Sequence, residues 1–391
     1  MPIVNRVAEL QDEVTAWRRY LHERPELGYE ERETAAFVAD KLRSFGVDEV
    51  HAGIGRTGVV GVLRGGPGKG TVGLRADMDA LPIQEQTGLA YASKIPGRMH
   101  ACGHDGHTAM LLGAARYLAE TRNFAGTVYL IFQPAEEGGA GGRAMIEDGL
   151  FERFPAERVF GLHNWPLRPL GTFAMCAGPA MAASDELTIT LRGIGCHAAA
   201  PHLGRDPIVA AALLVQALQT LIARETDPID RAVVSVTRIA GGDAYNVVPE
   251  QVELWGTIRS FAESTRQRLK RRVEEVAHGI AAAQGVTAQV RLKEGYPTTV
   301  NSPREAHLGA DVAAEIVGES AVDRDPAPFL AAEDFAFMLE RRPGSYIWMG
   351  TAQGEGTAQV HTPHYDFNDA AIAYGVSYWV RLVERLLPKS A

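Results

Sequence analysis

The stretch Val72-Gly-Leu-Arg-Ala-Asp-Met-Asp79 begins as a short apolar run and ends in two aspartates. A run of this kind, bounded by polar residues, is typical of a buried β-strand. Similar runs lie at 59–63, 128–132 and 159–162, and helical spacing of apolar residues marks 6–21, 31–45 and 108–121. Strands that alternate with helices predict an α/β domain with a mostly parallel central sheet. Asp105 precedes the last of these helical segments, so we expect it to cap that helix.

A second pattern starts near residue 184 and predicts strands at 187–191, 232–239, 252–258 and 286–292, with helices at 208–223 and 264–283. Asp206-Pro207 is a strong helix start, because it puts a capping side chain before a proline at the first helical position. The order β-α-β-β-α-β is that of a split βαβ, ferredoxin-like α+β domain. A strand-like run at 346–349 then returns to the α/β pattern. We therefore interpret 184–295 as a domain inserted into a larger one formed by 1–183 and 296–391.

Composition excludes several classes of protein. The 391 residues are 46% hydrophobic and 22% charged, which is ordinary for a folded globular chain and argues against disorder. The net charge of −9, without any basic run, argues against a nucleic-acid partner, and no apolar stretch reaches the length of a membrane helix. No secretory signal is visible, and three cysteines do not make a disulfide framework. We expect a cytoplasmic protein with neither a membrane nor a nucleic acid as partner.

The densest group of chemically active side chains is Met99-His-Ala-Cys-Gly-His-Asp-Gly-His107. Cys102 and His104, with a glycine between them, suit a loop that bends around a metal ion. The alternative is a helix start with unrelated histidines. Near the C-terminus, His361 precedes the last helical segment, and from local sequence alone it is equally a ligand or a surface residue.

The carboxyl ends of three predicted strands carry acids or an imidazole: Asp77-Met-Asp79, Glu136-Glu137 and His163. In open α/β sheets, ligands bind beyond the carboxyl ends of the strands, so we expect these groups to share one crevice. Adjacent Glu136 and Glu137 repel each other unless a cation lies near them. With a cation present, one of the two serves as a ligand and the other as a general base for a water molecule. The alternative for this pair is a solvated acidic turn.

The motifs together resemble the hippurate hydrolase and N-acyl-L-amino-acid amidohydrolase family, the binuclear metallo-aminoacylases related to plant auxin-conjugate hydrolases. The matching stretches are HERPELG at 22–28, LRADMDALP at 74–82, MHACGHDGH at 99–107, FQPAEEGG at 132–139, GLHNW at 161–165, NVVP at 246–249, GTIR at 256–259, EDF at 333–335 and HTP at 361–363. They span the chain in order. The resemblance implies a metal-binding α/β domain interrupted by a smaller lid domain that mediates dimerisation.

Residue roles follow from the resemblance, motif by motif. It implies five metal ligands, which are Cys102, His104, Glu137, His163 and His361. It also makes Glu136 the catalytic base and Asp79 the residue that orients a ligand. Five protein ligands complete two sites only if one is shared, so we expect Cys102 to bridge two divalent metal ions. A thiolate ligand favours zinc, while the carboxylate and imidazoles tolerate manganese, cobalt or nickel.

The lid motif at 193–202 implies further substrate contacts. His197 matches the histidine that reaches the substrate, where it stabilises the oxyanion, and the family's usual glycine before it is Cys196 here. Asn246 and Arg259 match positions that bind the substrate, and a guanidinium suits the carboxylate of an amino acid. The alternative for Arg259 is an exposed strand residue. We expect a homodimer formed through the lid.

The expected reaction is hydrolysis of an N-acyl-amino acid, of hippurate or N-acetyl type, by a metal-activated water. Three alternatives stay open: a metallo-dipeptidase or carboxypeptidase of the same superfamily, a cysteine hydrolase with Cys102 as nucleophile and His104 or His163 as base, and a non-catalytic protein that binds metal or acyl-amino acids. The cysteine hydrolase leaves the paired glutamates and His361 without a role. The sequence does not fix the acyl group or the amino acid.

Overall fold

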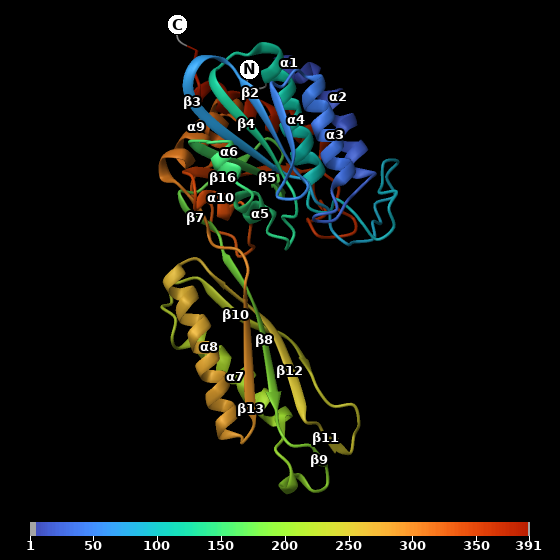
Figure 1. Cartoon of the computed structure of the whole chain (residues 1–391), viewed down its shortest axis with the longest axis vertical. Helices are drawn as coiled ribbons and strands as arrows, with labels where there is room; N and C mark the ends of the chain where they lie inside the picture. Colours follow the sequence, from blue (N-terminus) through green and yellow to red (C-terminus); the bar gives the residue numbers. More distant parts are fainter. Residues whose placement is uncertain (1–4, 390–391) are drawn as a thin grey trace. The chain divides into compact units, whose positions relative to one another are not determined.

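Residues 5–389 are described by a computed structural model, in which the chain separates into two compact units (Figure 1). The large unit contains the chain up to Ala180, Thr299–Ala327 and the chain from Asp334 onward. The small unit contains Met181–Thr298 and Pro328–Glu333. The boundaries predicted from the sequence, after 183 and after 295, each differ from these by three residues. That the large unit is the catalytic domain and the small unit a lid stays a prediction.

The large unit is built on an eight-stranded mixed sheet. In spatial order its strands are β1 (Glu49–Ile54), β2 (Gly58–Arg64), β4 (Ala125–Gln133), β3 (Gly66–Asp77), β5 (Arg158–Pro169), β16 (Gly344–Ala352), β6 (Phe173–Ala174) and β15 (Val322–Asp323). The four strands from β4 to β16 run parallel, and antiparallel pairs flank them at β1–β2–β4 and at β16–β6. A short sheet of β7 (Gly178–Met181) and β14 (Thr299–Asn301) completes the strands. The predicted α/β class with a mostly parallel central sheet is confirmed.

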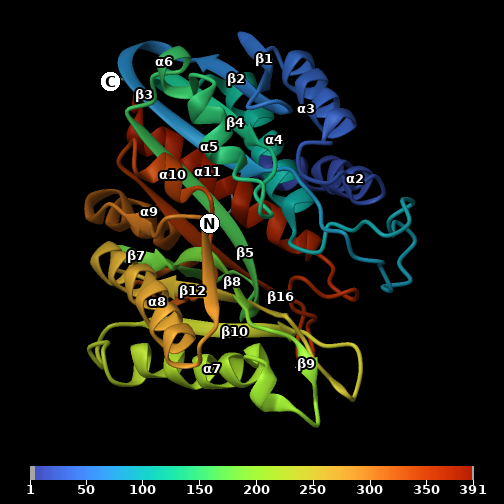
Figure 2. The ribbon, with the colours of Figure 1, turned by 60° about the horizontal axis from the view of Figure 1, so that its bottom comes forward.

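Helices pack against this sheet, and six of them, α1 to α4, α9 and α11, share one apolar core. They are α1 (Asn5–Glu9), α2 (Gln11–His22), α3 (Arg32–Ser44), α4 (His104–Thr121), α5 (Gly141–Glu147), α6 (Leu150–Arg153), α9 (Pro303–Val317), α10 (Ala336–Leu339) and α11 (Ile372–Leu386). Helix α4 is buried on nearly every side and lies beside α11 (Figure 2). Because α4 is buried so completely, the loop at its N-terminus, residues 99–103, is held at the carboxyl end of β3.

Three local predictions for this unit are wrong. The helix expected over 6–21 is interrupted at Leu10, between α1 and α2. Asp105 is not a cap, because α4 begins one residue earlier and its N-cap position is Gly103, with a φ of 92°. A Cβ at Gly103 would stand 2.2 Å from the side-chain oxygen of Asn164, so only glycine fits. The strand expected to end at His163 continues to Pro169, because β16 pairs with it over that whole length.

The small unit is a four-stranded antiparallel sheet with two helices packed on its core. Its elements are β8 (Ala183–Arg192), β9 (Cys196–His197), α7 (Pro207–Ala223), β10 (Ala232–Ala240), β11 (Val247–Val248), β12 (Gln251–Ser260), α8 (Glu263–Ala283) and β13 (Thr287–Glu294). The sheet order β10-β12-β8-β13 is that of the predicted split βαβ fold. The predicted cap of α7 is confirmed, since the Asp206 carboxylate accepts from the Ile208 N–H at 2.8 Å.

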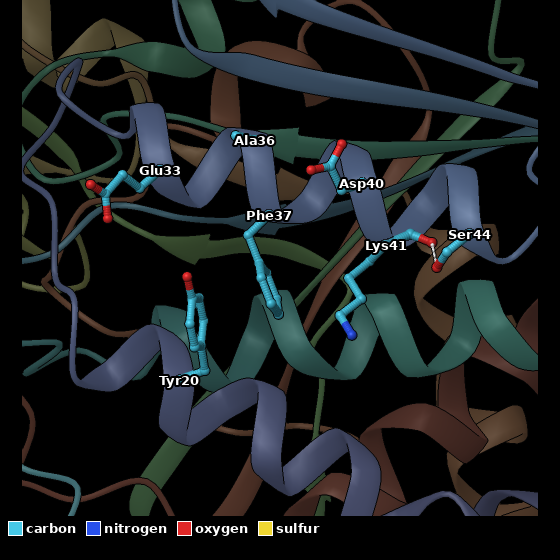
Figure 3. A pocket seen from close by; sticks show the side chains of 7 residues that line it. All are labelled: Tyr20, Glu33, Ala36, Phe37, Asp40, Lys41 and Ser44. Atoms are coloured by element: carbon cyan, nitrogen blue, oxygen red, sulfur yellow. Dashed lines mark hydrogen bonds between the residues drawn. The ribbon is translucent and has the colours of Figure 1, made fainter.

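The surface of the large unit carries an open pocket of about 490 Å³ between α2 and α3 (Figure 3). Tyr20 from α2 stacks on Phe37 from α3 at 4.7 Å between ring centroids, and Lys41 lies beside them. None of the residues that line this pocket carries a predicted site function. Among the described residues, none of the helices combines the length and the apolar character that crossing a lipid bilayer requires.

A buried ion pair ties α8 to the small unit's sheet and gives a test of its stability. Arg266 donates to both carboxylate oxygens of Asp185, at 2.8 and 2.6 Å, and both side chains are nearly inaccessible. Arg266→Ala leaves the Asp185 charge buried without its partner, so we expect a loss of about 3–5 kcal/mol in the free energy of unfolding. Urea denaturation measures it. Arg271→Ala, on the same helix but exposed, is the control and should cost less than about 0.5 kcal/mol; equal losses in the two variants would contradict the role of the pair.

Candidate metal centre

The predicted ligands of the large unit lie close together, next to the carboxyl end of β4 and the middle of β5. Cys102 and His104 come from the turn that starts α4, and Glu137 follows β4. His163 lies on β5, and His361 lies in the loop after β16. These four elements are far apart in sequence, and the parallel sheet brings their ends to one place.

The predicted ligands form two groups of three that share one residue. The first is Cys102, His104 and His163, and the second is Cys102, Glu137 and His361; within each group the ligand atoms lie within 4.8 Å of one another. Cys102 Sγ is 3.4 Å from His163 Nε2, and Glu137 Oε1 is 3.1 Å from His361 Nε2. A sulfur common to both groups is the arrangement that a bridging thiolate between two cations requires.

Asp79 holds two of these ligands in place. One of its oxygens lies 3.2 Å from His104 Nδ1, and its backbone oxygen lies 2.9 Å from the same nitrogen. The other carboxylate oxygen accepts from the Glu137 N–H at 2.9 Å. With Nδ1 engaged by acceptors, His104 has its Nε2 directed at the other ligands. Within residues 5–389, this buried Nε2 has no hydrogen-bond partner.

The other two histidines are oriented by the backbone. His163 Nδ1 donates to the Asn164 carbonyl at 2.7 Å, which leaves its Nε2 to face Cys102. The His361 N–H donates to the Ala101 carbonyl at 2.7 Å, with a φ of 62° at His361. His104 and His163 thus present Nε2 to the site with Nδ1 held by a second partner, as metal-bound histidines do. The half-exposed His361 side chain faces Glu137 through its Nε2.

Glu136 lies beside the ligands without belonging to either shared group. His104, Glu136 and Glu137 have ligand atoms within 4.8 Å of one another, and Glu136 is 8% exposed. The Asp334 N–H lies 3.4 Å from one Glu136 oxygen. Glu136 is therefore a mostly buried carboxylate that still has contact with solvent, which suits a group that exchanges protons.

Electrostatics show what the donor set lacks. Burial, together with the carboxylates of Glu137 and Glu136, raises the pKa of the Cys102 thiol well above its ordinary value. Burial opposes the charge on His104, yet the Asp77 and Asp79 carboxylates outweigh it and raise the pKa of His104 to about 10. Positive charge is thus favoured among these groups, and divalent cations would supply it while releasing the thiol and imidazole protons. The residues fit a metal centre.

Two supporting pairs beneath the site were missed by the sequence analysis. Asp77 accepts from His107 Nδ1 at 2.6 Å and from Arg75, while His107 Nε2 accepts from the Asn164 N–H. Both nitrogens of His107 are therefore occupied, so it does not fit as a ligand. Asp105 pairs with His22 at 2.8 Å instead of capping α4. The one sign in the sequence that these residues support the site was the position of Asp77, two residues before Asp79.

The candidate residues of the small unit fall at opposite ends of its sheet. His197 on β9 pairs with Val247 on β11, and the Ala198 N–H donates to the Asn246 carbonyl at 2.9 Å, so His197 and Asn246 are neighbours. Arg259 stands opposite Ser184, where the chain enters this unit. Eight residues along β12 separate Arg259 from Gln251, which is about 26 Å of strand.

Comparisons with known proteins agree with this geometry. A model of peptidase family M20/M25/M40 matches residues 73–385. The chain is 42% identical over 387 residues to the hippurate hydrolase of Campylobacter jejuni, covering 99% of this chain and 100% of that protein. It is 41% identical over 382 residues to an N-acetyl-L-cysteine deacetylase of Bacillus subtilis, covering 97% and 90%. The chain therefore belongs to peptidase family M20/M25/M40, which confirms the predicted resemblance and the expectation of a hydrolase.

A solved structure supports the fold over nearly the whole chain. The crystal structure of a Bacillus subtilis protein, described as a dinuclear metal-binding peptidase of the M20 family, superimposes with a TM-score of 0.83. It is 36% identical and covers 97% of this chain and 99% of that one. The agreement extends over both units, so the inserted small unit is part of the shared architecture.

The His22–Asp105 pair predicts how stability depends on pH. Burial alone lowers the pKa of His22, but the Asp105 carboxylate outweighs it and raises that pKa to about 9. Because its pKa is raised, protonated His22 stabilises the fold below pH ~6.5, and this stabilisation is lost as the pH rises through about 9. Without divalent metal ions, we expect the free energy of unfolding of wild type to exceed that of His22→Gln by roughly 2 kcal/mol at pH 6.5. This difference should narrow by pH 9.5. Urea unfolding at both values measures it, and a gap independent of pH would refute the assignment.

Proposed function

We propose that this protein is a metal-dependent amidohydrolase. It cleaves the amide bond of N-acyl-amino acids, of the hippurate or N-acetyl type, to a carboxylic acid and a free amino acid. The observation that carries the proposal is the pair of ligand groups joined by Cys102, with the additional carboxylate of Glu136 next to them. The names of the two relatives, a hippurate hydrolase and an N-acetyl-L-cysteine deacetylase, support this substrate class.

Two divalent cations per chain are part of the proposal. Cys102, His104 and His163 would hold one, and Cys102, Glu137 and His361 the other. When bound, such ions lower the pKa of water and polarise the acyl carbonyl of the substrate. The thiolate favours zinc, and manganese, cobalt or nickel also suit the carboxylate and imidazoles. The dinuclear relative of 36% identity supports the number of ions but does not name the metal.

Glu136 moves the proton in the proposed reaction. Its carboxylate accepts a proton from the attacking water and then donates it to the amide nitrogen, because an amine leaves far more readily than an amide anion. Asp79 and the Asp77–His107 pair hold their positions throughout. Asp79 fixes both His104 and the backbone of Glu137, so it keeps Glu136 at a constant place relative to the ligands.

His197 is suited to stabilise the oxyanion. The Ala199 N–H donates to His197 Nδ1 at 3.0 Å, which places the proton of the neutral imidazole on Nε2. An Nε2–H is a hydrogen-bond donor, so it can stabilise the negative charge that develops on the acyl oxygen. We propose that Asn246 binds the substrate beside His197, and that Arg259 binds its carboxylate.

The spacing within the small unit supports a homodimer. One N-acyl-amino acid does not extend over the ~26 Å between Arg259 and the Gln251 end of β12. The two ends of the sheet therefore serve different substrate molecules. We propose that Arg259 binds substrate at a different active site from His197 and Asn246, with His197 serving that of the partner subunit. A twofold-symmetric dimer then gives each site a full set.

The function is tested by release of free amine from hippurate, N-acetyl-amino acids and dipeptides. Metal-loaded wild type is expected to hydrolyse the N-acyl-amino acids, to lose activity on chelation and to regain it with divalent metal. Glu136→Gln removes the base and leaves the ligands, so we expect normal metal content with turnover reduced by about 10²–10⁴-fold. Metal analysis and initial rates measure both.

Each alternative function has its own outcome in this assay. Preference for dipeptides indicates a peptidase of the same family. Chelation-resistant activity that is abolished by alkylation indicates a cysteine hydrolase, and metal binding without any hydrolysis indicates a binding protein. Full turnover in Glu136→Gln would refute the base assignment. The cytoplasmic location stays a prediction from the cysteine content.

Sharing of His197 between subunits is tested by mixing two inactive variants. Glu136→Gln and His197→Ala are each expected to be inactive as homodimers. After subunit exchange, half of the dimers are mixed and each mixed dimer has one intact site, so activity should return to about one quarter of wild type. Initial rates after mixing measure this. Co-purification of one variant through an affinity tag on the other confirms the exchange, and no recovery among exchanged dimers would show that His197 serves its own chain.

A further inference from the structure

The segment 26–31, between α2 and α3, begins with the last three residues of the HERPELG motif, and the proposed mechanism leaves it without a role. Its first half joins the chain directly after Asp79. The Ala80 N–H donates to the Glu26 carbonyl at 2.8 Å, and Leu27 forms a parallel bridge with Ala80. The segment therefore holds the backbone from which the Asp79 side chain reaches two ligands.

The second half of the segment holds the turn that carries the two glutamates. Glu31 accepts from the Ala135 N–H at 2.8 Å, directly before Glu136. The Tyr29 hydroxyl donates to the Gly139 carbonyl at 2.7 Å, just after the turn. Gly28 lies against the same turn, since a Cβ there would stand 3.0 Å from the Ala135 Cβ. Both ends of 135–139 are thus tied to 26–31.

The turn needs such a constraint. Ala135 has a φ of 49°, and the left-handed region costs an L-residue about 1–2 kcal/mol. This conformation decides where the side chains of the next two residues point. Glu31 is fully buried, and its second oxygen accepts from the Thr57 hydroxyl at 2.6 Å, so it is itself fixed.

The segment is also rigid in itself. The Glu26 carboxylate accepts from three backbone N–H groups at the start of α3, those of Arg32, Glu33 and Thr34, at 2.8–3.1 Å. A carboxylate at a helix N-terminus is stabilised by the unpaired N–H groups and by the helix dipole. The anchor of the segment is therefore α3, which belongs to the apolar core.

We propose that residues 26–31 are a positioning clamp, which sets the Glu136–Glu137 turn relative to Asp79, with Glu31 as the main positioning residue. Glu31 acts through the Ala135 backbone and touches neither metal ligand nor substrate. The expected effect on catalysis rests on the proposed function, whereas the expected effect on the turn rests on the contacts alone. Neutral glutamine serves as well as glutamate at this position, because its side-chain oxygen accepts from Ala135 and its NH₂ donates to Thr57.

The test compares Glu31→Ala with Glu31→Gln in the full chain. Glu31→Ala is expected to speed amide hydrogen exchange in 133–141 by at least about 10-fold. It should weaken Mn²⁺ binding or lower kcat at saturating Mn²⁺ by about 10–100-fold, with KM little changed. Glu31→Gln should behave as wild type in all of these. If Glu31→Ala does not fold, Tyr29→Phe takes its place in the test. This variant removes only the hydrogen bond to Gly139, so it should give a smaller effect in the same direction.

Glu305→Ala is the matched control. Glu305 is also a nearly buried carboxylate of the large unit, but it pairs with Arg158. It should lose stability without changing exchange in 133–141 or Mn²⁺ binding. Unchanged exchange in Glu31→Ala overturns the clamp, and so does faster exchange with wild-type Mn²⁺ affinity and kcat. If wild type hydrolyses no amide, the proposed function fails, while exchange and Mn²⁺ titration still decide the clamp.

Discussion

The carboxylate of Asp79 lies between His104 Nδ1 on one side and the backbone N–H of Glu137 on the other. This one side chain joins the start of α4 to the turn after β4, two segments that the sequence separates by about thirty residues. Asp79 itself is buried and lies two residues beyond the end of β3. The rest of the site depends on this contact, because it fixes the position of the His104 imidazole relative to the Glu137 carboxylate.

The site gathers acids and a thiol in a place with little water. Such a group is unfavourable by itself, since like charges repel more strongly where solvent is excluded. The surrounding network reduces that cost without removing it: Arg75 neutralises Asp77, which also accepts a hydrogen bond from His107, and His22 with Arg18 neutralises Asp105. The carboxylates of Glu136 and Glu137 remain beside the predicted thiol and imidazole ligands, which is where cations would bind.

Much of the fold could be predicted because its signals are local. The strands at 72–76 and 128–132 and the cap at Asp206 each follow from a few adjacent residues. The errors have a different origin. Asp105 resembles a cap, but the close approach of Asn164 to Gly103 moves the helix start, and His22 then takes the carboxylate. Such contacts join residues about sixty or eighty positions apart, so a local pattern does not contain them.

The sequence by itself determined the fold class, the family and the identity of the groups able to bind metal, because residue types in ordered motifs state which chemistry the chain possesses. Only the tertiary structure decided that Asp79 contacts both His104 and Glu137, and that Arg259 and His197 lie at opposite ends of the small unit. The physical reason is that spacing between segments is set by strand pairing and core packing. These long-range interactions convert a list of reactive side chains into distances and directions.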